Sequence, residues 1–198
     1  MTKIETAALA ASALVGLVLL RSRSSPPGPT TPTPPAPPAP PGGSNDGRRA
    51  AAVTVGLREF ERVNAPGAPR ANPADYWAVA ADQQLTAAEV QKLDWCGGFY
   101  LWALKMAGVA SPLVFWKFDG TGIGSAHLKP TADPKPADLA YFEKNQHHAL
   151  IESVDGDTIN LINGNGGGQG ITRSSVSRSQ VAAFYSVDPL LRAPGLNA

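Results

Sequence analysis

Cysteine and histidine are both scarce in this chain of 198 residues, which contains one cysteine and three histidines. The single thiol, Cys96, excludes an internal disulfide. Neither HxxxH nor CxxC spacing occurs, so we expect no metal site and no bound cofactor. The formal net charge is only +1, and basic residues form no dense run and do not alternate with aromatic residues. Nucleic-acid binding therefore has no support in the sequence.

Proline, in contrast, is concentrated near the start of the chain, where ten of the 19 prolines fall between Pro26 and Pro41. This segment lacks the apolar side chains and the backbone donors that packing requires, so we expect an extended polyproline spacer. The composition predicts four parts. They are an apolar segment within residues 1–24, a linker over 25–49, a globular domain over 50–190 and a tail over 191–198.

The apolar segment carries no charge between residues 6 and 20, and its length lies between that of a signal-peptide core and that of a spanning helix. No Ala-x-Ala cleavage site follows it, which favours an uncleaved membrane anchor. Arg21 and Arg23 follow it directly, and by positive-inside counting they would keep the domain in the cytoplasm. Topology is therefore open at this point, as is the choice between a host envelope protein and a phage-encoded one.

Cys96 lies in the run 94–102, which reads as a turn that opens into a helix. Asp94 is a good N-cap residue. From Phe99 the apolar residues follow helical spacing and predict one buried stripe, and Gly108 is expected to end the helix. A thiol at a helix N-terminus is stabilised as an anion by the unpaired N–H groups and the helix dipole, which lowers its pKa. The alternative is a small buried hydrophobic residue.

Two further stretches read as strands of a β-hairpin, residues 147–154 and 158–165, joined by a turn at Asp155–Asp157. Histidines enter the first strand and asparagines leave the second. A cysteine, a distant histidine and an Asn or Asp on a neighbouring strand form the arrangement used for nucleophilic acyl transfer. The residues near 136–142 and 180–187 suggest two more strands.

Together these motifs resemble the CHAP domain, a family of cysteine- and histidine-dependent amidohydrolases and peptidases within the papain-like NlpC/P60 group. The motifs that carry the resemblance are Trp95-Cys96-Gly97-Gly98-Phe99, the segment 136–142, His147 followed by 154–157, and Asn163-Gly164-Asn165. It spans residues 53 to 187, and it implies cleavage of amide bonds in bacterial peptidoglycan. Two positions depart from the family pattern, namely the second histidine, His148, and Asn163, where many members carry Glu.

The register of the hairpin decides which histidine is the base. A three-residue turn pairs Val154 with Thr158 and brings His147 opposite Asn165. His147, Ala149 and Ile151 then share a face with the apolar and asparagine residues of the second strand. This register favours His147 as the base and Asn165 or Asn163 as the group that orients it, with His148 as the alternative.

The sequence therefore predicts an α+β domain in which the Cys96 helix packs on a curved antiparallel sheet of about five strands. We expect a monomeric peptidoglycan hydrolase of the cell envelope, anchored or secreted, with Cys96 as the nucleophile, His147 as the base and Asn165 or Asn163 as the third residue. Its scissile bond is either the muramoyl-alanine amide or a peptide bond. A catalytically silent wall-binding or virion structural module with the same fold is the alternative.

Overall fold

The computed structural model describes residues 44–81, 94–109, 128–167 and 170–191. The expected apolar segment, most of the linker and one of the three histidines, His127, lie outside these ranges. None of the helices in the described part of the chain is long and apolar enough to cross a membrane. The helices are α1 (Asn45–Asn64), α2 (Pro73–Ala81), α4 (Cys96–Met106) and α6 (Asp188–Leu191). The strands are β1 (Lys129–Pro130), β2 (Leu139–Phe142), β3 (His147–Asp155), β4 (Thr158–Gly166), β5 (Gly170–Ser177) and β6 (Ala183–Ser186).

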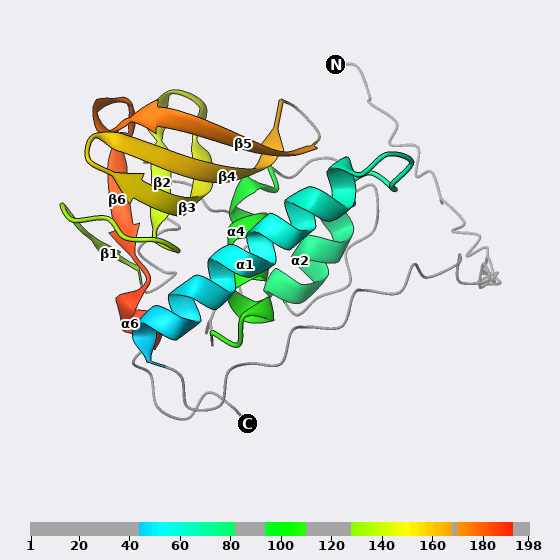
Figure 1. The fold of residues 1–198 in the computed structure, drawn as a ribbon, viewed down its shortest axis with the longest axis horizontal. Helices are drawn as coiled ribbons and strands as arrows, with labels where there is room; N and C mark the ends of the chain where they lie inside the picture. Colours follow the sequence, from blue (N-terminus) through cyan, green and yellow to red (C-terminus); the bar gives the residue numbers. More distant parts are fainter. Residues whose placement is uncertain (1–43, 82–93, 110–127, 168–169, 192–198) are drawn as a thin grey trace, which may run out of the picture. The chain divides into compact units, whose positions relative to one another are not determined.

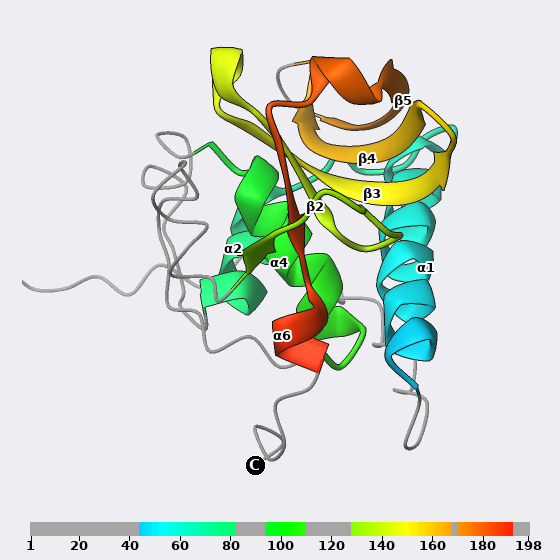
Figure 2. The same ribbon diagram turned by 90° about the vertical axis from the view of Figure 1, so that its left-hand side faces the viewer.

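The strands form one antiparallel sheet in the order β1-β6-β2-β3-β4-β5. Helices α1 and α4 pack against β3 and β4, and α2 packs on α4 (Figure 1). The view in Figure 2 shows how strongly β3, β4 and β5 curve. The predicted α+β class, with the Cys96 helix packed on a curved antiparallel sheet, is confirmed, and the described sheet has six strands where about five were expected.

The sheet is apolar on both faces, and each face contributes to a different core. Leu150 of β3 and Ile162 of β4 belong to the main core, which also contains the helices. Ile151 and Leu161, their neighbours in sequence, belong to a second and smaller cluster with Phe184 of β6. Alternate residues of a strand point to opposite faces, so both sets of side chains are buried. An apolar residue in β3 or β4 therefore does not by itself identify the helix-covered face.

The β3–β4 hairpin differs from the prediction at its turn and agrees with it farther along. Asp155 pairs with Thr158 around a two-residue turn, in which Gly156 has φ +56°, so the three-residue turn is wrong. A bulge at Glu152, between Ile151 and Ser153, then shifts the register by one residue. Beyond the bulge, Leu150 pairs with Ile162 and Ile151 with Leu161, which is the register predicted for that end of the hairpin.

Helix α4 is buried on nearly all sides, whereas one buried stripe was expected. Its residues from Cys96 to Leu104 are all buried, because α2, α1 and the sheet surround it. The helix ends at Met106, and Gly108 follows with φ +73°, as the sequence predicted. The first turn of α4 lies beside β3 and β4, and this placement brings Cys96 to the edge where β3 begins.

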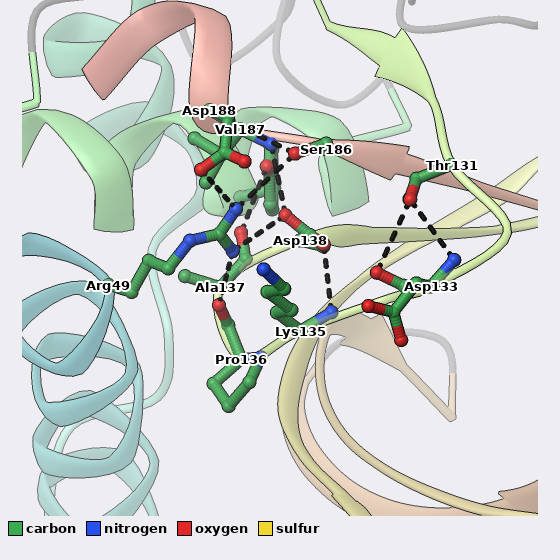
Figure 3. A network of polar contacts seen from close by, with 11 residues as sticks. Arg49, Thr131, Asp133, Lys135, Pro136, Ala137, Asp138, Ser186, Val187 and Asp188 are labelled. Carbon is green, nitrogen blue, oxygen red and sulfur yellow. Dashed lines mark hydrogen bonds and ion pairs between the residues drawn. The ribbon is translucent and has the colours of Figure 1, made fainter. Parts of the chain in front are cut away.

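A buried network of ion pairs connects the first turns of α1 to the residues just before β2 and just after β6 (Figure 3). The guanidinium of Arg49 donates to Asp138 Oδ1 at 2.7 Å and to Asp188 Oδ1 at 2.8 Å. Asp138 Oδ1 also accepts the backbone N–H of Val187 at 3.0 Å. Residues 45–49 were assigned to the linker, but they form the first turns of α1, and Arg49 is part of the folded domain.

Candidate active site

Cys96 is the first residue of α4, and Trp95 is the N-cap residue. The Trp95 side chain makes no capping hydrogen bond, and its carbonyl accepts the N–H of Phe99 at 2.9 Å. Asp94 was expected to cap the helix. It instead lies one position too early, where its carboxylate accepts a hydrogen bond from Asn165 Nδ2 at 3.5 Å. The N–H groups of Cys96 and Gly97 precede the first hydrogen bond of the helix's own ladder.

The thiol of Cys96 contacts His148 and not His147. Cys96 Sγ lies 3.5 Å from His148 Nδ1, across 52 residues of sequence. His148 is fully buried, and its ring lies 5.2 Å from that of Tyr141 on β2. In the neutral tautomer with its proton on Nε2, Nδ1 can accept the thiol proton. The structure thus assembles a cysteine–histidine pair, but with the histidine that the register argument ranked second.

His147 points to the opposite face of the sheet, because it is the neighbour of His148 on one strand. Its Nε2 lies 3.0 Å from Asn163 Oδ1. Asn163 in turn donates to Ser174 Oγ at 3.0 Å, on β5. The predicted partnership of His147 with an asparagine of β4 is therefore present. The expectation that this pair faces Cys96 is wrong, because α4 covers the other face.

Asn165, like Asn163, is not among the described contacts of His148. It has φ +58°, a left-handed conformation that asparagine tolerates better than most residues. The β4–β5 register shifts between Asn163 and Gly166, and Asn165 reaches towards Asp94 from this irregular segment. Among the described residues, Asn163 is bonded to His147 and Ser174, and Asn165 is bonded to Asp94. Asn165 thus connects the end of β4 to Asp94, two residues before Cys96.

Gly164 allows α4 to approach the sheet closely enough to form the cysteine–histidine pair. A Cβ atom at this position would lie 2.4 Å from Phe99 Cβ, far inside van der Waals contact. Phe99 is three residues after Cys96, so this contact sets the distance between the first turn of α4 and strand β4. The Asn163-Gly164-Asn165 motif therefore contributes to the site through its glycine, for which the motif alone predicted no role.

Burial raises the pKa of the Cys96 thiol above its ordinary value. Hydrogen bonding to the backbone of His148 and Gly97 acts in the opposite direction, and the negative charge of Asp94 adds to the rise. The expected lowering at the helix N-terminus is thus outweighed, because the side chain is only 4% exposed. The pKa of His147 is lowered, also by burial. At neutral pH the resting site therefore contains a protonated thiol.

The large aromatic side chains around α4 have structural roles in the described part of the chain. Tyr76, Trp77, Trp95 and Trp102 are all buried in the main core. Within the described ranges, no three His, Cys, Asp or Glu side chains are close enough to hold a metal ion. The reactive side chains that the described residues bring together are the thiol at the start of α4 and the imidazole of His148 on β3.

Comparison with protein-family models and with curated proteins finds no match for this chain. Among solved structures, the chain is similar to the one reported as "The crystal structure of Ly7917", with a TM-score of 0.35 and 14% sequence identity. The match covers 70% of this chain and 61% of the other, which is less than two thirds of its length. A similarity at this level does not establish a shared fold.

Proposed function

We propose that this protein is a cysteine-dependent amidohydrolase or endopeptidase of the papain-like CHAP type, acting on amide bonds of bacterial peptidoglycan. The observation that supports this type of reaction is the contact of 3.5 Å between Cys96 Sγ and His148 Nδ1. A thiol at the head of a helix and an imidazole on an adjacent strand are the two parts that thiol-dependent acyl transfer requires. The peptidoglycan substrate is proposed from the resemblance of the sequence motifs.

In the proposed mechanism, His148 is the general base. As Sγ attacks the carbonyl carbon of the substrate, the thiol proton moves to His148 Nδ1 and the carbonyl electron pair moves to the oxygen. The backbone N–H of Cys96, which the helix ladder does not use, is a suitable donor to that oxygen. The imidazolium then gives its proton to the leaving amine. Water then attacks the remaining thioester while His148 accepts its proton, and this proton passes to Sγ as the C–S bond breaks and the carboxylic acid product leaves.

Burial of the thiol is compatible with this scheme, because a general base makes a resting thiolate unnecessary. The proton leaves Sγ only as the new bond forms. Burial equally supports a second candidate function, a catalytically silent wall-binding or virion structural module. The two candidates differ in whether Cys96 reacts.

The proposed location is the cell envelope, with the domain held by the apolar segment and the proline-rich spacer. This part of the proposal rests on the sequence alone. Protease added to intact spheroplasts should digest a domain that faces the wall. Digestion only after lysis would instead put the domain in the cytoplasm.

The decisive experiment is digestion of purified peptidoglycan, followed by mass spectrometry of the soluble products. New amine and carboxyl ends at one type of bond would identify an amidase or an endopeptidase. Cys96→Ala should abolish product release while retaining the far-ultraviolet circular dichroism of the wild type. Wall binding without product release by the wild type, or undiminished release by Cys96→Ala, would contradict the hydrolase proposal.

A further inference from the structure

We propose that Glu59 and Tyr76 are positioning residues for Cys96, and that they act through the indole of Trp95. This inference rests on the proposed role of Cys96 as a nucleophile. Neither residue touches the thiol. Together they connect α1 and α2 to the residue immediately before it.

The connection begins with a buried carboxylate. Glu59 on α1 is only 4% exposed, and a buried carboxylate requires compensating partners. Arg62 supplies the charge through two hydrogen bonds, Nε to Oε2 at 2.7 Å and Nη2 to Oε1 at 2.6 Å. The Tyr76 hydroxyl donates to the same Oε1 at 2.6 Å. Glu59 thereby fixes the position of a side chain on another helix.

The aromatic ring of Tyr76 carries this constraint to the start of α4. It stacks on Trp95 with ring centres 5.4 Å apart and planes inclined by 15°. It also meets Phe99 and Trp102 edge-on, at 5.6 Å and 5.2 Å. One ring therefore contacts the N-cap residue and the first two turns of the nucleophile helix.

Trp95 needs such support, because its side chain does not cap the helix. Its backbone has φ −100° and ψ 9°, values of the sparsely populated bridge region. A shift of Trp95 would turn the Cα–Cβ bond of Cys96. It would thus change the alignment of Sγ with His148 and with the backbone groups that lower the pKa of the thiol.

Tyr76 supports the site from within the core and does not line a substrate subsite. It is 2% exposed, its hydroxyl is bound to Glu59, and its ring is enclosed by three aromatic residues. It can therefore affect the reaction by holding the nucleophile helix, without contacting substrate.

The test is the pH profile of Cys96 alkylation by iodoacetamide in the full-length protein. Cys96 is the only cysteine, so the measured rate reports this thiol alone. In the Tyr76→Phe variant we expect the apparent pKa of the profile to rise and the rate at neutral pH to fall roughly threefold to tenfold, because thiolate is the reacting form. Glu59→Leu should have the same effect. Glu59→Gln retains an oxygen acceptor for the Tyr76 hydroxyl, so this variant should keep the wild-type pH profile of alkylation.

Tyr100→Phe is the matched control. It removes another buried tyrosine hydroxyl, which donates to Ala137 O at 3.2 Å, and no Tyr100–Trp95 ring contact exists among the described residues. This control should lower the unfolding midpoint but leave the alkylation profile unchanged. An unchanged profile in both Tyr76→Phe and Glu59→Leu, or an equal change in Tyr100→Phe, would overturn the positioning role alone. A wild-type thiol that reacts only after denaturation would overturn the proposed nucleophile and the positioning role with it.

Discussion

Replacing Gly164 with alanine should separate helix α4 from the sheet. The added Cβ would lie 2.4 Å from Phe99 Cβ and 2.8 Å from Phe99 Cγ. Carbon atoms in contact are normally about 3.5–4.0 Å apart, so β4 and α4 must move apart by about 1 Å. The obstructing atom is a Cβ, fixed to the backbone, and no change of rotamer can remove it.

Overpacking of this kind costs about 1–3 kcal/mol, and the rigid contact places Gly164→Ala in the upper half of that range. We expect the free energy of unfolding to fall by about 2–3 kcal/mol, measured by urea denaturation followed by circular dichroism. Phe99 is one turn beyond Cys96. The same displacement should therefore lengthen the Cys96–His148 contact and slow alkylation of the thiol in the folded protein.

Gly47→Ala is the control for this substitution. An added Cβ at Gly47 would meet only Ser44 Oγ at 3.6 Å, an ordinary contact, and it would lie in the first turn of α1. Its unfolding midpoint should match or exceed that of the wild type, because alanine favours the helix. If Gly164→Ala kept both the wild-type midpoint and the wild-type alkylation rate, the close approach of α4 to β4 would be refuted.

Five further substitutions test the site and its support. His148→Ala should reduce product release from peptidoglycan by about 10²–10⁴-fold, as expected for loss of a general base, and His147→Ala should leave most of it. Asp94→Asn removes a charge that raises the pKa of Cys96, so alkylation below that pKa should become faster. The lowered pKa of His147 means that the unfolded state binds its proton first on acidification. Stability should therefore fall as the pH drops from about 6.5 towards the lower folded-state pKa, and less so in His147→Gln, as measured by urea midpoints. Arg49→Met leaves two buried or half-buried aspartates without their cation and should cost about 3–5 kcal/mol in urea denaturation.

Local patterns in the sequence were sufficient for the parts of the fold that depend on neighbouring residues. The helix that begins at Cys96 and stops before Gly108 follows from a turn, an apolar run and a glycine. The hairpin of β3 and β4 follows from two apolar runs around Gly156. The register at Leu150 was also predicted, although the predicted turn was wrong, because the bulge at Glu152 compensates for the shorter turn.

The choice between the two histidines required the tertiary structure. His147 and His148 point to opposite faces of β3, and both faces are apolar, through Ile151 on one side and Leu150 on the other. A hairpin pattern shows which residues share a face, but it does not show which face a distant helix covers. The face that α4 covers is determined by the packing of α4 on β4 at Gly164.

The charge state of the thiol was likewise decided by tertiary packing. The sequence located Cys96 at a helix N-terminus, and the local effect of that position is to lower the pKa. Burial by elements far away in sequence opposes this effect and outweighs it. Thus the sequence by itself determined which residue is the candidate nucleophile and on which element it lies. Only the tertiary structure decided its partner and its protonation, because both depend on which distant surfaces exclude water from the thiol.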